Sequence, residues 1–266
     1  VGSEMCIRDR SLADTKVWLD TSAQFGPLVK PIITPRFVPS CTSELMTGLA
    51  KLAKEYDVPV QSHLSENHGE IDWVASLHPE SSNYTDVYYE HHLMGTVPTV
   101  MAHCIHLSDV EMDRMAETQT MVSHCPYSNV NLSSGIAPIR KLIERNIPIG
   151  LGSDISGGHI VSMAKVLTEA IGLSKMKWAE VDPNYAPLTL SEAFYMATKG
   201  GGQFFGHVGS FEKGYELDAL IIDDTSLFDP NERSLEERLE RWLYVGDDRH
   251  IIERYVAGRV VPSPKG

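Results

Sequence analysis

The sequence predicts an α/β fold in which helices flank a parallel β-sheet. Three observations lead to this prediction. Short apolar segments of strand length alternate with amphipathic segments of helix length from residue 31 onward. Capping and turn residues separate the two kinds of segment. Polar residues stand at the carboxyl ends of the apolar segments, which is where α/β folds carry their chemistry. Strands that alternate with helices pair in parallel through right-handed crossovers.

The strands and helices of this predicted sheet follow in order along the first part of the chain. The expected strands cover residues 31–37, 58–64, 99–105, 121–126 and 147–153. The expected helices cover residues 43–55, 68–77, 108–117 and 137–145. Ser43 and Ser108 are the expected N-caps of two of these helices. Asn146, followed by Pro148, is the expected end of the last helix.

The chain changes character after residue 154. Two longer helical segments are expected at 160–177 and 191–199. Two β-like segments follow at 216–222 and 252–261, and the second contains a turn at Ala257 and Gly258. We expect these strands to belong to a small second sheet domain. The polar residues 224–245 between them are expected to form a loop and a helix on the surface.

The composition is that of a globular protein, and it argues against nucleic acid as a partner. A length of 266 residues allows one large domain, or a domain with a small appendage. A net charge of −13 repels the phosphate backbone, whereas a small neutral substrate is unaffected. No run approaches the length of an apolar membrane span, so no membrane partner is expected.

The cysteines predict a reducing, cytoplasmic location. Their spacing matches no zinc finger and no CxxC pattern, and the sequence shows no signal peptide. They are Cys6, Cys41, Cys104 and Cys125. The first ten residues, VGSEMCIRDR, lack periodicity, and we interpret them as a foreign leader outside the fold.

Four polar residues form a candidate catalytic constellation. His63, His103 and Asp154 end three separate predicted strands of one sheet, and Glu66 follows just after the first of them. Histidine and carboxylate side chains suit Zn²⁺, and a catalytic zinc site keeps one position open for water. Glu66 could reach the site without binding the metal, which suits a general acid/base, and Asp154 could hold or accept a proton.

Each of these residues also has a structural interpretation. A single histidine is most often a surface or core residue, and an aspartate shortly before Gly157 and Gly158 is commonly a turn residue. Cys104 and Cys125 stand beside histidines in predicted strands, where a thiol is usually a buried hydrophobe. The residues alone therefore leave both a metal hydrolase and a structural interpretation open.

Several motifs, in this order and spacing, carry a resemblance to a known family. The motifs are SHLSE (62–66), MAHCIHLS (101–108), SHCPYSN (123–129) and GLGSDISGG (150–158), together with TPRF (34–37), NLSSG (131–135) and YVGDDRHI (244–251). The first four resemble the ring-amine deaminases of the amidohydrolase superfamily, and the last three resemble the guanine deaminase family within it. Each motif alone is weak, but the ordered set is highly specific, and it covers about residues 28–262.

The resemblance implies a role for each matching residue. His63 and Asp154 would be zinc ligands. Glu66 would carry protons between water and the purine ring nitrogen. His103 would hydrogen-bond the attacking water or the tetrahedral centre, and His124 would be supporting structure.

The resemblance also implies a substrate site. Arg36 and the backbone around Phe37 would hold the purine carbonyl and ring edge, with His63, Glu66 and His103 facing the bound purine. A salt bridge is the structural alternative for Arg36, because an arginine at a strand end often forms one. The expected partner is a small purine, and a homodimer is an expectation from the family only.

The sequence departs from the family pattern at one point. The family takes two further zinc ligands from a His-x-His pair on its first barrel strand, and this sequence contains no such pair. We therefore expect a C-terminal fragment: an incomplete (β/α)8 TIM-like barrel with about strands 4–8, followed by part of a small β-sandwich domain. The expected parts are a foreign leader at 1–10, the partial barrel at 11–210 and the small-domain segment at 211–266.

The expected function of the parent protein is zinc-dependent deamination of guanine to xanthine and ammonia, with the fragment inactive alone. One alternative is another ring-amine amidohydrolase acting on cytosine, a triazine or an adenosine-like substrate. Another is a non-catalytic interaction protein on the same scaffold. The unrelated cytidine-deaminase type requires a PCxxC motif, which is absent from the sequence.

Overall fold

A computed structural model describes the backbone of residues 2–227 and 229–262, and side chains from residue 7 onward. The chain divides into two compact units. The first comprises residues 1–123 and 141–148, and the second comprises residues 124–140 and 149–266.

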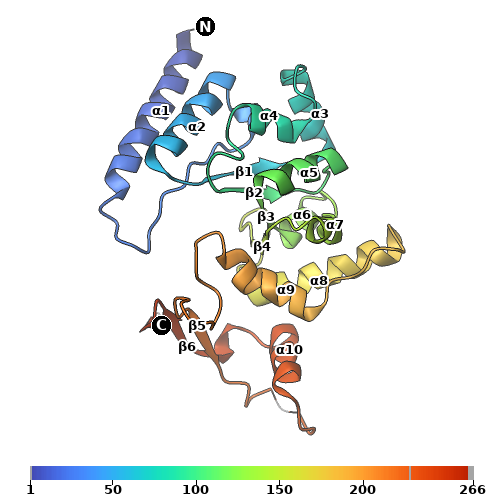
Figure 1. The fold of residues 1–266 in the computed structure, drawn as a ribbon. Coiled ribbons are helices and arrows are strands. Elements are labelled where there is room, and N and C mark those ends of the chain that lie inside the picture. Colours follow the sequence, from blue (N-terminus) through green and yellow to red (C-terminus); the bar gives the residue numbers. More distant parts are fainter. Residues whose placement is uncertain (1, 228, 263–266) are drawn as a thin grey trace. The chain divides into compact units, whose positions relative to one another are not determined.

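A parallel sheet is the base of the first unit. Strand β1 (Val60–Leu64) pairs with β2 (Thr99–His103) along its whole length. Strand β2 pairs in turn with β3 (Met121–His124). The sheet has four strands in chain order, and the fourth is β4 (Ile149–Leu151), whose residues are assigned to the second unit (Figure 1). The predicted α/β fold with a parallel sheet is confirmed, although each strand is shorter than predicted.

The strand predicted at 31–37 is wrong as a regular strand. Only Ile33 bridges to Val60: its N–H donates to the Pro59 carbonyl at 3.0 Å, and its carbonyl accepts from the Gln61 N–H at 2.9 Å. The next ladder bond on this side would need an N–H from residue 35. Pro35 has none, so the ladder stops after one bridge.

The predicted helices of the first unit are present, with small changes at their ends. They are α2 (Ser43–Tyr56), α3 (His68–Leu77), α5 (Asp109–Thr118) and α7 (Ile139–Glu144), the last containing the boundary between the units. Ser108 caps α5 as predicted, in a reciprocal capping box with Glu111. The cap predicted at Ser43 is wrong, because Thr42 accepts the Leu45 N–H instead. Asn146 ends α7 in the left-handed region, at φ 56°.

Two helices of the first unit were not predicted. Helix α1 (Gly2–Ser22) includes residues 2–10 of the segment interpreted as a leader, whose foreign origin stays a prediction. It packs on α2 so closely that a Cβ on Gly48 would lie 2.7 Å from the Leu12 side chain. Helix α4 (Tyr84–Glu90) is only seven residues long, and such a helix shows too little periodicity to be predicted.

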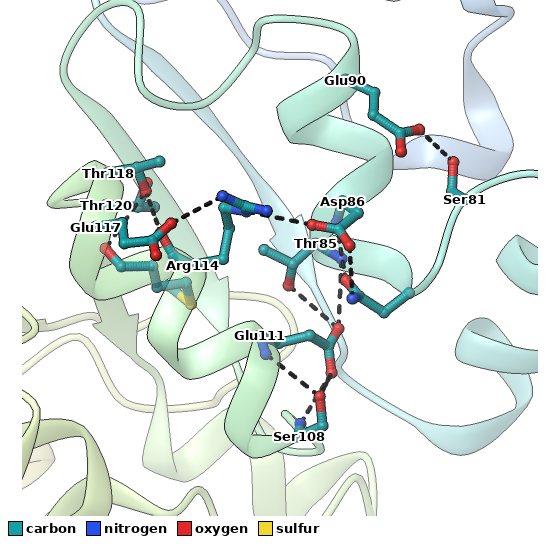
Figure 2. Close-up of polar contacts among 12 residues, drawn as sticks. Ser81, Thr85, Asp86, Glu90, Ser108, Glu111, Arg114, Glu117, Thr118 and Thr120 are labelled. Atoms are coloured by element: carbon teal, nitrogen blue, oxygen red, sulfur yellow. Dashed lines mark hydrogen bonds and ion pairs between the residues drawn. The ribbon is translucent and has the colours of Figure 1, made fainter.

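Polar contacts fix α4 against α5 (Figure 2). The buried Glu111 accepts hydrogen bonds from the Thr85 N–H and hydroxyl on α4, and from the Ser108 N–H and hydroxyl that precede α5. Arg114 of α5 contacts Asp86 of α4 at 3.3 Å and Glu117 at 2.8 Å. A buried carboxylate with four donors costs little to bury and holds its neighbours in place.

The second unit combines helices with a small antiparallel sheet. Its helices are α6 (Pro126–Asn131), α8 (Met163–Glu180), α9 (Leu190–Tyr195), which continues as a π-helical turn (Met196–Gly200), and α10 (Leu235–Val245). Its sheet contains β5 (Ala219–Ile222), β6 (Ile251–Val256) and β7 (Arg259–Val260). Ala257 and Gly258 make the predicted turn, both with positive φ, as a two-residue hairpin requires. A short 3-10 helix lies at Asp248–His250 in this unit, and another lies at Val38–Ser40 in the first unit.

The described helices include none with the length and apolar character needed to cross a membrane. The β-sandwich that we predicted around β5–β7 stays a prediction, as do the domain boundaries at residues 10 and 210.

Candidate functional site

The carboxyl ends of β1 and β2 bring three predicted site residues together. His63 lies on β1 and His103 ends β2, and their rings stack with centroids 5.4 Å apart. Glu66 follows β1, and its Oε2 lies 3.7 Å from His103 Nε2. This is an ion-pair distance for a protonated histidine and is too long for a hydrogen bond. His103 is buried, whereas the Glu66 side chain is 18% exposed, so the carboxylate can meet both solvent and His103.

The ring of His63 is held in one orientation. Its Nδ1 lies 2.6 Å from the carbonyl oxygen of Arg36, and its backbone N–H donates to the same oxygen at 3.3 Å. A carbonyl can only accept, so Nδ1 carries a proton, and in the neutral ring Nε2 then keeps its lone pair. Metal-binding histidines usually have this arrangement, in which the second nitrogen donates to a carbonyl or carboxylate.

The backbone at these strand ends is strained. Ser65, His103 and Cys104 all have φ between 50° and 71°, a region that costs non-glycine residues of order 1–3 kcal/mol each. Hydrogen bonds offset this cost: the Cys104 N–H donates to Leu64 and the Ile105 N–H donates to Ser65. The two strand ends are thereby fixed to one another, and Glu66 is brought to His103.

Arg36 and Phe37 lie at the edge of β1. The Arg36 guanidinium carbon is 5.8 Å from the centroid of the Phe37 ring, and Phe37 meets Trp73 of α3 edge-on at 6.1 Å. Within the described part of the first unit, the exposed Arg36 guanidinium forms no ion pair, so the salt-bridge alternative gains no support there. Arg36 also lines a cavity of about 580 Å3 beside α1 and α2.

Asp154 belongs to the second unit and sits in a tight turn after β4. Its φ is 43°, and its carbonyl accepts the Gly158 N–H at 2.6 Å. The amide of Asn131 donates to the Gly157 carbonyl at 2.7 Å. A Cβ on Gly157 would lie 2.6 Å from both Asp154 Oδ2 and Ser128 Oγ, so a larger residue here would have to displace these two side-chain ends.

The residues present fit zinc only in part. His63 offers a lone pair on Nε2, and the Asp154 carboxylate is a suitable donor in the second unit. In the part of the chain that the structure describes, no group of three His, Cys, Asp or Glu side chains could hold a metal ion. His124 ends β3, is buried, and accepts the Gly152 N–H at its carbonyl.

Sequence reasoning missed a group of buried polar residues behind β1. Glu70 is the third residue of α3, while Tyr84 and Tyr88 come from α4. The spacing from Asn67 to Glu70 is a helix-start signal that could have identified Glu70. The tyrosines gave no signal, because α4 itself was not predicted.

Comparisons with known proteins agree with this description. The sequence model of a family described as "Amidohydrolase family" matches residues 14–261 of this chain. A guanine deaminase of Dictyostelium discoideum is 44% identical over 261 residues, covering 95% of this chain and 58% of the relative.

Solved structures give the same picture. Guanine deaminase from C. acetobutylicum, solved with guanine bound in its active site, is 52% identical with a TM-score of 0.92, and covers 96% of this chain and 60% of its own. An adenosine deaminase from Xanthomonas campestris with bound zinc is 22% identical with a TM-score of 0.82, covering 95% and 56%, a likeness of fold alone. The chain thus spans less than two thirds of the length of these relatives.

Proposed function

The chain belongs to the amidohydrolase family, and from that membership we propose that the protein containing it hydrolyses guanine to xanthine and ammonia. One observation carries this proposal: an acidic side chain, Glu66, faces a buried histidine, His103, beside a second histidine whose tautomer is fixed. This arrangement suits a reaction that moves protons next to a metal ion. The similarity to guanine deaminases supports guanine as the substrate.

We assign metal binding to His63 and Asp154. A zinc ion held by these residues would supply Lewis-acid activation of the attacking water. Two protein ligands are fewer than the roughly three that a catalytic zinc site uses. The remaining ligands would come from a part of the protein outside these residues, in keeping with the greater length of the relatives.

Glu66 is the proposed acid/base. Its carboxylate takes a proton from the attacking water and delivers it to the ring nitrogen next to the amine-bearing carbon. The carbon–oxygen bond forms as the electron pair of the ring carbon–nitrogen double bond moves to the ring nitrogen. The bond from the same carbon to the amine then breaks as the amine takes the second proton of the water and leaves as ammonia, while the added oxygen becomes the carbonyl of xanthine. His103 donates a hydrogen bond to the tetrahedral centre, and Asp154 holds the other water proton during the transfer.

Arg36 and the backbone around Phe37 are the proposed substrate contacts. A guanidinium group donates well to a carbonyl oxygen, and guanine has a ring carbonyl that adenine lacks. The exposed guanidinium beside an aromatic ring supports this assignment, because a flat purine edge can lie along both groups.

We infer that the four-stranded sheet is part of a (β/α)8 barrel over residues 11–210, and that 211–266 contribute to a small β-sandwich domain. Expression of residues 11–266 alone tests this inference. Weak zinc binding and no guanine turnover are expected, whereas one tightly bound zinc per chain with full turnover would contradict it.

The substrate is tested with the intact protein. Guanine should be converted to equal amounts of xanthine and ammonia. The kcat/KM values for cytosine, adenosine and an amino-triazine should be at least about 100-fold lower than the value for guanine. If one of these other amines were converted faster than guanine, that compound and not guanine would be the substrate. Purine binding without ammonia release from any of them would favour a non-catalytic role.

A further inference from the structure

A buried carboxylate that the proposed reaction does not use lies directly behind Glu66. Glu70 is only 7% exposed. Its Oε2 accepts the backbone N–H of Glu66 at 2.9 Å, and its Oε1 accepts the Tyr84 hydroxyl at 2.7 Å. Its own N–H donates to the side chain of Asn67, the N-cap of α3. Glu70 therefore joins the start of α3 to the turn that carries Glu66.

The partner tyrosines reach the other end of the same turn. Tyr88 donates to the His63 carbonyl at 2.9 Å and meets the Ser62 hydroxyl at 2.7 Å, while the Tyr84 hydroxyl lies 3.5 Å from the same carbonyl. Both tyrosines are buried, and each hydroxyl donates to an acceptor within this group, Tyr84 to Glu70 and Tyr88 to His63. His63 and Glu66 are thus held by one connected set of side chains.

Helix α4, which carries both tyrosines, is itself fixed in place. Glu111 and Arg114 of α5 bind its first turn (Figure 2), and the Tyr84 and Tyr88 rings stack one helical turn apart with centroids at 5.6 Å. Movement of the tyrosines would have to break these contacts. The set is therefore a rigid support and not a mobile surface feature.

The turn between His63 and Glu66 needs such a support. Ser65 lies in the left-handed region at φ 50°, a conformation that a serine adopts only when its surroundings enforce it. From these contacts we propose that Glu70 is a positioning residue, which with Tyr84 and Tyr88 holds the Glu66 carboxylate at His103. This inference rests on the proposed function only for the chemistry that Glu66 performs.

A double-mutant cycle in the intact protein tests the inference. Glu70→Ala should lower kcat for guanine by about 10–100-fold with KM within about threefold, because an acid/base is displaced while substrate binding is kept. In a Glu66→Gln background the same change should cost less than about threefold, because the group being positioned is already lost. Glu70→Gln should restore activity, since its amide can accept from Glu66 and donate to Tyr84.

Glu192→Ala is the matched control. Glu192 is likewise the third residue of a capped helix, α9, but it lies in the second unit. It should lower stability with kcat unchanged. Equal losses of kcat from Glu70→Ala in both backgrounds, or an equal loss from Glu192→Ala, would reduce Glu70 to a structural residue.

Amide hydrogen exchange at Glu66 tests the support without any need for activity. The exchange rate of the Glu66 amide should rise by about tenfold or more in Glu70→Ala and should stay unchanged in Glu192→Ala. Unchanged exchange at Glu66 in Glu70→Ala would overturn the inference. A protein that does not convert guanine but shows the expected exchange would contradict the proposed substrate and leave the support intact.

Discussion

Acid pH should weaken one particular ion pair of the second unit, and the size of the effect follows from its geometry. Arg140 binds Glu192 with two bonds, at 2.7 and 2.9 Å. Arg140 also donates to the carbonyls of Ala186 and Pro187. The pair therefore fixes the loop before α9 as well as α9 itself.

Hydrogen bonds from the Arg140 guanidinium lower the pKa of Glu192 from 4.5 to about 2, although partial burial acts in the opposite direction. The full shift would be worth about 3 kcal/mol of unfolding free energy. The Glu192 side chain is 32% exposed, so solvent screening reduces this to roughly 1–2 kcal/mol. Because the folded-state pKa is depressed, this stabilisation is present above the unfolded pKa and is lost as the pH falls toward 2.

Urea unfolding of the wild type and Glu192→Gln at a series of pH values measures the effect. Glutamine keeps the helix cap, so the difference isolates the ion pair. At neutral pH the variant should be less stable by roughly 1–2 kcal/mol, and the gap should close on acidification. Glu237→Gln in α10 is the control, because Glu237 caps in the same way without a two-bond arginine partner. Parallel pH curves for wild type and Glu192→Gln would refute the reasoning.

Three further predictions concern the proposed site. Glu66→Gln should keep zinc bound and lower kcat by about 10²–10⁴-fold, which metal analysis and a guanine turnover assay measure together. Turnover near the wild-type rate would contradict the acid/base role of Glu66. Arg36→Met should lower kcat/KM for guanine by about 10–150-fold, from roughly 1.5–3 kcal/mol of lost hydrogen bonding, with little change in Tm. A large drop in Tm with unchanged kinetics would instead make it a structural residue. Gly157→Ala should place a Cβ 2.6 Å from Asp154 Oδ2 and Ser128 Oγ, and should weaken zinc binding by displacing the carboxylate. Unchanged zinc affinity would show that the turn can relax.

The sequence predicted the parallel sheet and the positions of its strands because period, length and punctuation agree along that part of the chain. It failed at residues 31–37, where apolar character alone favoured a strand. Pro35 has no N–H to donate to a strand ladder. This ends the pairing only because the side of the segment that bonds through Ile33 faces β1, and the tertiary structure decides which side that is. Helix α4 was missed for a related reason, since contacts with α5 stabilise it more than its own short sequence does.

The candidate site was predictable as far as residue types at strand ends are informative. His63, Glu66 and His103 do meet in the first unit. The fixed tautomer of His63 was not predictable, because it depends on the Arg36 carbonyl, and a backbone oxygen leaves no trace in a sequence pattern. The close fit of Gly157 against Asp154 likewise appears only once the turn is folded.

The glutamates at the third position of the helices show how a local rule and a functional exception differ. Glu111, Glu192 and Glu237 each return a hydrogen bond to the N–H of their own N-cap residue, as the capping-box pattern predicts. Glu70 has the same position and an equally good cap, yet its carboxylate bonds the N–H of Glu66, one residue earlier. The same side chain could have closed an ordinary capping box within α3. Because its bond instead holds the turn that presents Glu66 to His103, the exception lies where the proposed chemistry needs a fixed carboxylate, which is the reason to test Glu70 before any other buried residue.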